Sequence, residues 1–559
     1  MATIPSAVLA GIWLPFVIVG GLSLFLCFFY VRYYQRRRDA EVSVTITIIS
    51  GLTVSLLTLA LIPVDIFGVS QMKTSMGDFK EWSADPNASR KDVESTFRYM
   101  YYAFYSVVML FVFLVLPFMY FYYEEGDEGV STARRCCSAL KYWIGFCVAL
   151  AVVLLIGAFV PWASEQQFDN NETTSDYARL FLGSFASNRG QNALSFTISF
   201  LALIGAVCSV LYTGPGMVAL PIDLIRGYRR VEDERDELTS RKKRHDSHQR
   251  NFDSKYGRER RAMSSKDRKR MENFKAGERL LKRRQKRFDA ATKGCGMRCH
   301  KCMRPFSILS GIVLFLVALL IFFCLLMNGI DRILHSKGYR YGFLLNKSTL
   351  PNPVGYLLLW SQTFFPLDYV LLIALIFFFV FATLYGIRRM GIWFFCLKMY
   401  QIRPHRTPPQ GLLFTAFILM TFVVSLGVTV TTVAPQYTRF GHQFFNASYK
   451  ESVNVSDSSN ATCLGVLQQK ECTIERQSML CDSSDCVETQ FSSLVYQFCY
   501  RTWFFSLIYF ACQLGMLVTF LLGLVVVLCR KKRSNIHDHG DSDTESSSDE
   551  SLLDLESRV

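Results

Sequence analysis

The amino-acid sequence predicts an all-α polytopic membrane protein, and two observations carry that prediction. The first is composition: of the 559 residues, 51% are hydrophobic and only 19% are charged, whereas a soluble chain of this length would form several domains with charged surfaces. The second is pattern, because runs of about 20 apolar residues, each long enough to cross a bilayer as a helix, recur along the chain. Disordered, fibrous and small disulfide-stapled classes are thereby excluded.

We expect nine transmembrane helices. The apolar runs place them near residues 8–31, 43–69, 99–123, 142–162, 193–221, 307–328, 367–386, 411–434 and 503–529. The chain then divides into five spans within 1–221, a basic helical cytosolic loop at 222–306, three spans within 307–434, a glycosylated Cys-rich outer loop at 435–502, the last span at 503–529 and a disordered acidic cytosolic tail at 530–559.

Lys and Arg orient the chain, since they are retained on the cytoplasmic side of a membrane. No charged residue precedes the first apolar run, whereas Arg32 and residues 36–38, all arginine, follow it. This order is the reverse of that in a secretory signal and predicts a lumenal or extracellular N-terminus. Nine spans then end with a cytosolic C-terminus, which agrees with the basic run at residues 530–533.

Asparagine sequons and cysteines support the same orientation. Six N-x-[ST] sequons fall in segments that the charge rule places outside, where glycosylation occurs: they are Asn87, Asn171, Asn346, Asn446, Asn454 and Asn460. Four cysteines cluster in the outer loop, with Cys499 nearby, and an oxidising compartment should pair four of these: the four in the loop are Cys463, Cys472, Cys481 and Cys486. Their connectivity stays open.

The basic excess does not indicate a nucleic-acid partner. The net charge of +15 arises within residues 221–306, which carry few aromatic side chains for base stacking. A solvated cytosolic loop beside anionic membrane lipids is favoured. We expect residues 226–292 to form an extended helical hairpin, because they are rich in charged helix formers and contain no proline.

Catalysis and a resident cofactor are not indicated. The eight histidines lie outside the predicted spans, those spans contain no Lys or Arg, and no phosphate-binding loop occurs. Cys295, Cys299 and Cys302 have the spacing of an iron–sulfur site, but their basic surroundings beside a span suit S-palmitoylation or free thiols better. A metal site that includes His300 is the minor alternative. We therefore expect no enzyme, no resident metal and no cofactor.

Three acids follow a proline near the end of a span: Asp65, Asp223 and Asp368. An ionisable residue within a span is by default a functional hypothesis, but capping is the commoner role at a helix end, and both interpretations stay open. Pro366 also interrupts an apolar stretch, so we expect a half-helix at residues 354–364 before the seventh span. This break indicates either a transport site or a simple helix–turn–helix.

Two short motifs in the cytosolic segments predict intracellular sorting. Tyr228 and Val231 fit the Tyr-x-x-apolar signal that clathrin adaptors bind. In the tail, Asp549 with Leu552 and Leu553 forms an acidic dileucine signal. Three serines beside it have acidic neighbours and are candidate phosphorylation sites: Ser546, Ser547 and Ser548. Together with a glycosylated outer face, these signals favour the endosome–lysosome system.

The sequence resembles the limb-region (LMBR) family of multispan membrane proteins over nearly its whole length. Seven segments carry the resemblance: Leu61–Phe67, Phe118–Glu125, Gly157–Pro161, Phe365–Tyr369, Gly386–Phe395, Arg406–Gln410 and Ala434–Tyr437. They are markers of a fold and contain no catalytic or binding motif. The resemblance implies nine spans, in agreement with the apolar runs.

The resemblance also implies a non-enzymatic function in the export of cobalamin, vitamin B12, from the lysosome. It implies an escort for a D-subfamily ABC transporter, acting beside a cytosolic cobalamin-processing chaperone, with cobalamin as the transported ligand. A second implied role is at the plasma membrane, as an adaptor between the insulin receptor and clathrin with its adaptor complex. The endoplasmic reticulum is a further expected location.

Two alternative functions stay open. A cell-surface receptor for lipocalin-like ligands should bind them through residues 435–502, and a lipid-moving protein or channel should be active when it is reconstituted alone. The oligomeric state is also open, although Gly20 and Gly21 would permit the close helix contacts of a homodimer.

Overall fold

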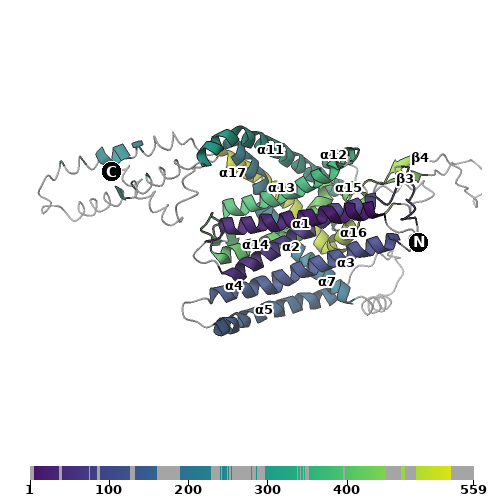
Figure 1. The fold of residues 1–559 in the computed structure, drawn as a ribbon, viewed down its shortest axis with the longest axis horizontal. Coiled ribbons are helices and arrows are strands. Elements are labelled where there is room, and N and C mark those ends of the chain that lie inside the picture. The colour runs from purple at the N-terminus through teal and green to yellow at the C-terminus, as the bar shows by residue number, and fades with distance from the viewer. Residues whose placement is uncertain are drawn as a thin grey trace, which may run out of the picture. The chain divides into compact units, whose positions relative to one another are not determined.

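The computed structural model describes residues 5–36, 41–74, 76–84, 89–125, 132–159, 189–227, 296–336, 338–339, 342–343, 345, 350, 352–364, 366–394, 397–447, 468–472, 486–500 and 502–529, with scattered positions between 239 and 285. The chain forms two units, Met1–Ala219 with Leu316–Val525, and Leu220–Phe315 with Val526–Val559. In the first unit, the helices named α1, α2, α3 and α5 run roughly parallel to one another (Figure 1).

Nine helical stretches among the described residues are long and apolar enough to cross a membrane, which confirms the predicted all-α class and each predicted span. In chain order they are α1 (Ser6–Tyr34), α2 (Val42–Ser70), α3 (Ser89–Leu110) continued by the π-helix η1 (Phe111–Val115) and α4 (Leu116–Glu124), α5 (Thr132–Phe159), α7 (Arg189–Cys208) continued by the π-helix η2 (Ser209–Thr213) and α8 (Gly214–Arg226), α11 (Gly296–His335), α13 (Leu367–Met390), α14 (Pro409–Val433) and α17 (Trp503–Cys529).

The sixth span differs from its prediction in a way that matters for function. It was expected to end at residue 328, but the helix continues to His335. Arg332 lies in this continuation of the helix with only 9% of its surface exposed. Asp331 and Arg332, the polar residues just beyond the predicted end of this span, are both buried inside the first unit.

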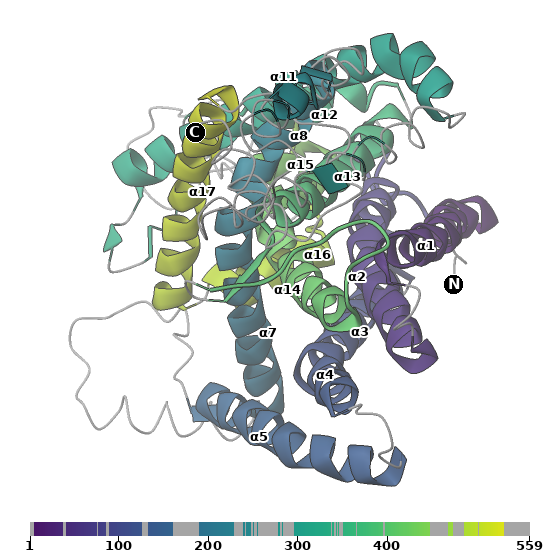
Figure 2. The ribbon, with the colours of Figure 1, turned by 90° about the vertical axis from the view of Figure 1, so that its left-hand side faces the viewer.

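Close contacts at glycines organise the first unit around α14, which lies among α2, α7 and α16 (Figure 2). A Cβ atom at Gly205 of α7 would lie 2.0 Å from the carbonyl oxygen of Thr421 in α14. Small residues at such crossings let helix backbones approach closely in membranes. By contrast, a Cβ atom at Gly21 of α1 would have no atom within 4 Å, and one at Gly20 would lie 3.1 Å from the side chain of Leu57.

Short elements connect the spans. They are α12 (Pro353–Ser361), α15 (Pro435–Phe440), α16 (Gln490–Val495), the π-helix η5 (Tyr496–Tyr500), and two antiparallel hairpins, β1 (Ile392–Phe394) with β2 (Leu397–Tyr400) and β3 (Phe444–Ala447) with β4 (Gln468–Glu471). In register, Ile392 pairs with Tyr400 and Phe444 with Glu471. Helix α12 agrees with the expected half-helix. The strands were not predicted, because three or four residues are too few for an alternating pattern to show.

A buried acid connects the second span to α16. Asp65 of α2 is 0% exposed, and its Oδ2 accepts a 2.7 Å hydrogen bond from the backbone N–H of Phe491. Phe491 lies in the first turn of α16, where backbone N–H groups have no partner within their own helix. The N-cap residue Thr489 accepts from the next donor, the N–H of Ser492, at 3.2 Å. Asp65 therefore caps a helix other than its own.

Asp368, at the start of α13, binds α15 in a similar way. Its Oδ2 accepts a 3.0 Å hydrogen bond from the hydroxyl of Tyr437, and both side chains are buried. Burial, together with nearby Tyr369 and Asp368, raises the pKa of Tyr437 well above its ordinary value, so the phenol keeps the proton that it donates. The hydroxyl of Thr489 donates to the carbonyl oxygen of Thr438 at 2.6 Å. These contacts hold α15 and α16 against α2 and α13.

In the second unit, two arginines bind the carbonyl ends of helices. Arg304 of α11 donates to the carbonyl oxygens of Leu224 at 3.0 Å and Ile225 at 2.7 Å, in the last turn of α8. Arg226 donates to the carbonyl oxygen of Val527, near the end of α17. The last carbonyls of a helix have no partner within it and carry partial negative charge, so an arginine there is stabilising.

The glycine crossing leads to a first prediction. Gly205→Val should destabilise the protein by about 1–3 kcal/mol, because the new side chain would overlap the carbonyl group of Thr421. Gly21→Val is the matched control and should change stability little, since its site is open. Thermal unfolding of both purified variants in one detergent measures the difference. Equal melting temperatures would contradict the close approach of α7 to α14.

The cap on α16 leads to a second prediction. Asp65→Ala should lower the free energy of unfolding by about 1–3 kcal/mol, because a buried N–H group loses its acceptor. Asp65→Asn keeps an oxygen acceptor and should lose less. Asp92→Asn, which changes an exposed acid in the first turn of α3, is the control. Thermal unfolding followed by intrinsic fluorescence provides the measurement, and a wild-type transition for Asp65→Ala would show that this carboxylate does not hold α16.

Candidate functional site

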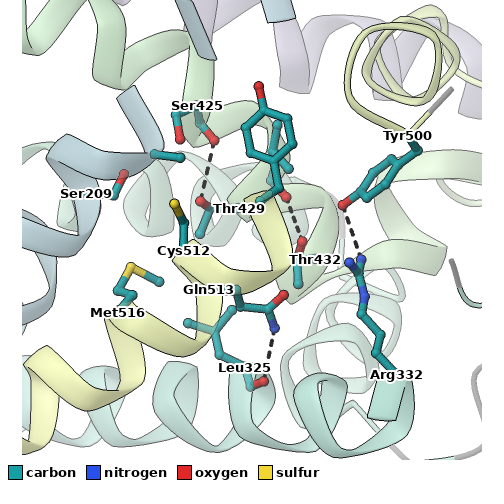
Figure 3. A pocket seen from close by; sticks show the side chains of 13 residues that line it. Ser209, Leu325, Arg332, Ser425, Thr429, Thr432, Tyr500, Cys512, Gln513 and Met516 are labelled. Atoms are coloured by element: carbon teal, nitrogen blue, oxygen red, sulfur yellow. Dashed lines mark hydrogen bonds between the residues drawn. The ribbon is translucent and has the colours of Figure 1, made fainter. Parts of the chain in front are cut away.

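A polar cavity of about 40 Å³ lies inside the first unit (Figure 3). Its lining comes from α7 with η2, and from α11, α14, η5 and α17, which are far apart in the sequence. The polar members of the lining are Ser209, Arg332, Ser425, Thr429, Thr432, Tyr500, Tyr509, Cys512 and Gln513. Polar and ionisable groups are costly within membrane spans and mark functional sites there, so this cavity is the candidate site.

Two π-helical turns contribute to the lining. The turn η2 interrupts the fifth span and carries Ser209, and the turn η5 precedes the ninth span and carries Tyr500. Turns of this kind are rare inside helices and are frequent at functional sites. Their convergence on one cavity is a second reason, independent of polarity, to choose it.

Arg332 is the charged residue among the described residues that line the cavity. Its Nη2 donates to the hydroxyl of Tyr500 at 3.2 Å (Figure 3). Its guanidinium carbon lies 5.3 Å from the centre of the Tyr500 ring. Its Nε is buried and has no hydrogen-bond partner among the described residues. Arg332 therefore lines the cavity with an N–H group, at Nε, that makes no hydrogen bond to the described residues.

Several other polar side chains of the cavity donate to backbone carbonyl groups. Ser209 and Thr432 each donate to the carbonyl oxygen four residues earlier in the chain, at 2.8 Å and 2.7 Å. Gln513 of α17 donates to the carbonyl oxygen of Leu325 in α11, at 3.1 Å. Because these protons are already used locally, the guanidinium is the strongest available donor in the cavity.

A second cavity, of about 160 Å³, shares Arg332, Thr432 and Tyr500 with the first. Its lining also includes Arg439, whose Nη2 forms a 2.6 Å ion pair with Oε1 of Glu488. Of the two arginines in this wall, Arg439 has an acidic partner, whereas Arg332 has none among the described residues.

Two larger cavities have a different chemical character. They measure about 300 and 380 Å³. Both are lined by α1, α2 and α13, and α14 adds to the wall of the larger one. Their walls are largely aliphatic and aromatic, with Phe67 and Phe377 in one and Tyr30, Phe381 and Phe422 in the other. Such walls suit the chains of lipids.

The chemistry available in the polar cavity is that of binding. A guanidinium that stays charged at physiological pH, a phenol and several hydroxyl groups can hold a polar anion or ordered water. Among the described residues, no group of three or more His, Cys, Asp or Glu is placed to hold a metal ion.

None of the sequence-predicted site residues that the structure describes lines this cavity. Asp65 and Asp368 hold α16 and α15, and Asp223 lies in α8, in the other unit. Cys472 forms a disulfide with Cys486, Asn446 belongs to β3, and Cys299 and Cys302 belong to α11. The following lie outside the described residues, as does most of the hairpin expected at 226–292: Asn87, Asn171, Asn346, Asn454, Asn460, Tyr228, Val231, Cys295, Cys463, Cys481, Ser546, Ser547, Ser548, Asp549, Leu552 and Leu553.

Sequence reasoning missed the residues at the centre of the site. The sequence places Asp331 and Arg332 beyond the sixth span, and the structure shows them buried, 1% and 9% exposed, in a continuation of the same helix. A signal was present, because Ile333 and Leu334 follow them and continue the apolar helix with outward-facing side chains. Asp331 also precedes His335 by one helical turn, and the two form a 2.8 Å contact that supports a continuing helix.

Comparison with known proteins gives consistent matches over the full length. The sequence profile of the LMBR1-like membrane proteins matches residues 13–293. The chain is 40% identical to a "Probable lysosomal cobalamin transporter" of Nematostella vectensis, over 97% of this chain and 98% of the relative. It is 39% identical to "Lysosomal cobalamin transport escort protein LMBD1" of Danio rerio over 97% of both chains, and 37% identical to the protein of that name in Gallus gallus over 99% of both. No solved structure matches significantly. The chain therefore belongs to the family of LMBR1-like membrane proteins.

Proposed function

We propose that this chain acts in the release of cobalamin from the lysosome, as a non-enzymatic membrane protein that escorts an ATP-driven transporter. The observation that carries the proposal is similarity at 37–40% identity, over nearly the whole chain, to relatives named for lysosomal cobalamin transport. Two of these relatives are named as escort proteins. A multi-pass fold suits a protein that accompanies another membrane protein.

The described cavities favour an escort over a carrier. Cobalamin is a bulky corrinoid with many polar amide groups, and it exceeds the drug-sized ligands that pockets of about 300–1,000 Å³ enclose. The polar cavity around Arg332 measures about 40 Å³ and its neighbour about 160 Å³. The two larger cavities have apolar walls. In this proposal cobalamin is the ligand that the partner transports, and the chain itself needs no cofactor.

Two spans have the exposed faces that a membrane partner needs. Only 6% of the apolar window of α5 and 17% of that of α1 is buried within the protein. On α5, Ile144 and Val148 are 52% and 56% exposed. We assign these faces to membrane lipids and to a D-subfamily ABC transporter, with a homodimer as the alternative use. We assign the helical segment expected at 226–292 to the same transporter, with the cytosolic cobalamin-processing chaperone acting beside the chain.

The proposed orientation places the N-terminus in the lumen and the C-terminus in the cytosol. Six sequons in segments of one side and basic residues in segments of the other support it. Both sorting motifs are then cytosolic, where adaptor complexes bind such signals. We propose that the protein enters the endoplasmic reticulum, resides in the lysosomal membrane and passes through the plasma membrane in clathrin-coated vesicles. There it has a second role, linking the insulin receptor to clathrin and its adaptor complex.

The escort mechanism predicts a specific pattern of rescue. Deletion of this chain should leave cobalamin in lysosomes and the ABC transporter outside them. A lysosomal targeting signal fused to that transporter should then largely restore export without this chain, because placement is what the escort provides. Lysosomal cobalamin content and transporter location are measured together, with an unrelated lysosomal membrane protein as the control for general trafficking. Export that stays blocked despite correct placement would show that the chain does more than escort.

The sorting motifs predict separate effects on delivery and uptake. Leu552→Ala with Leu553→Ala should send the protein to the cell surface, because the dileucine signal is lost. Tyr228→Ala should slow its uptake from there, because a clathrin adaptor no longer binds. Surface labelling and lysosomal colocalisation measure the two steps, and Tyr256→Ala in the same loop is the control. Normal delivery and uptake in the combined variant would make both motifs chance matches.

A further inference from the structure

Among the residues that the structure describes, the arginine of the polar cavity has no acidic partner. Arg332 is 9% exposed, and the hydroxyl of Tyr500 is the polar atom that it contacts among the described residues. The adjacent acid Asp331 forms its own contact with His335, at 2.8 Å. The guanidinium therefore carries a buried positive charge that the described acids do not balance.

A buried charge of this kind requires a balancing group. Taking an ion out of water without a partner is strongly destabilising. Lysine or histidine can lose its proton in such a place, but arginine stays charged. An ionisable residue within a span therefore points to a bound group or a polar pathway. Here the span is α11, and the space beside its arginine is a cavity.

The directions of the available donors suit a tetrahedral oxyanion. Nε of Arg332 has no partner, and the proton of the Tyr500 hydroxyl is not used in its contact with the guanidinium. Figure 3 shows the side chain of Ser425 reaching the cavity from α14, on another side from Arg332, while the hydroxyl of Thr429 donates to the carbonyl oxygen of Ser425 at 3.4 Å. A phosphate group presents oxygens in several directions, so it can accept from the guanidinium and from a hydroxyl at the same time.

The size and the surroundings of the cavity agree with a single small group. A water molecule needs about 10–15 Å³ of such space, so about 40 Å³ holds a group of a few non-hydrogen atoms. The adjoining cavity of about 160 Å³ has Arg439 in its wall, and a second basic side chain there raises the local concentration of anions.

We propose that Arg332 anchors a binding site for a single phosphate group, with Tyr500 as its second ligand. The phosphate is either free inorganic phosphate or the headgroup of an anionic phospholipid, since both present the same oxygens. The proposal does not rest on cobalamin transport, because it concerns binding by the purified chain.

The experiment measures ligand-dependent stability of the full-length chain. Inorganic phosphate is titrated in detergent against chloride at equal ionic strength, and nanodiscs containing phosphatidic acid are compared with nanodiscs of phosphatidylcholine alone. A ligand that binds the native state raises the melting temperature with concentration. We expect a saturable increase with one of the two probes, and at least about tenfold weaker binding in Arg332→Gln.

Further variants separate the site from general effects of charge. Arg98→Gln removes an arginine that bonds Gln490 outside the cavity, and it should bind like the wild type. Arg332→Lys keeps the charge but loses the fork, and Tyr500→Phe loses one donor, so both should weaken binding. These two variants carry the test if Arg332→Gln does not fold.

Each outcome has one meaning. Saturation by inorganic phosphate that depends on Arg332 assigns a soluble anion, and a response confined to phosphatidic acid that depends on Arg332 assigns a lipid headgroup. No saturable response to either probe would overturn the proposal. Equal responses of the wild type, Arg332→Lys and Tyr500→Phe would also overturn it. Neither of these results would bear on cobalamin release, which the rescue experiment tests separately.

Discussion

The constraint on which this structure depends is that membrane hydrocarbon offers no hydrogen bonds, so polar groups must find partners within the chain. On α14, the hydroxyl of Thr415 donates to the carbonyl oxygen of Gly411 at 2.8 Å, and Thr432 donates to Val428 at 2.7 Å. Asp65 satisfies a donor that belongs to another helix. Arg332 departs from this rule, since its Nε has no partner among the described residues. It is one of several buried polar atoms without a partner among the described residues, and it belongs to the charged side chain in the wall of the polar cavity.

The same constraint explains why α14 can be so fully enclosed. The apolar window of this helix is 83% buried, whereas that of α5 is 6% buried. Close approach at Gly205 brings the backbone of α7 against the backbone of α14 at Thr421. The enclosed helix then provides a fixed wall, from which Ser425, Thr429 and Thr432 face the polar cavity. The polar cavity therefore depends on the close packing of α7 against α14.

Spans could be predicted from the sequence because a span depends on local composition. The ninth prediction, residues 503–529, coincides with α17, and the others fall at the observed places with shifted ends. The cap on α16 could not be predicted, since it joins residues 426 positions apart. Arg332 was missed for a related reason: a polar residue at the end of an apolar run looks like an exit from the membrane. Only tertiary contacts, here with η5 and α14, show that it is enclosed.

The distance along the chain between Asp65 and Phe491 has a consequence for how the protein is made. Ribosomes add about 5–20 residues per second, so roughly 20–85 s separate the synthesis of these two residues. During that interval the carboxylate is inserted with its helix while its eventual partner does not yet exist. A nascent chain that stops before α16 would contain the eight preceding spans and would lack the backbone N–H group of Phe491 that this carboxylate binds, so α2 reaches its final set of contacts only late in synthesis.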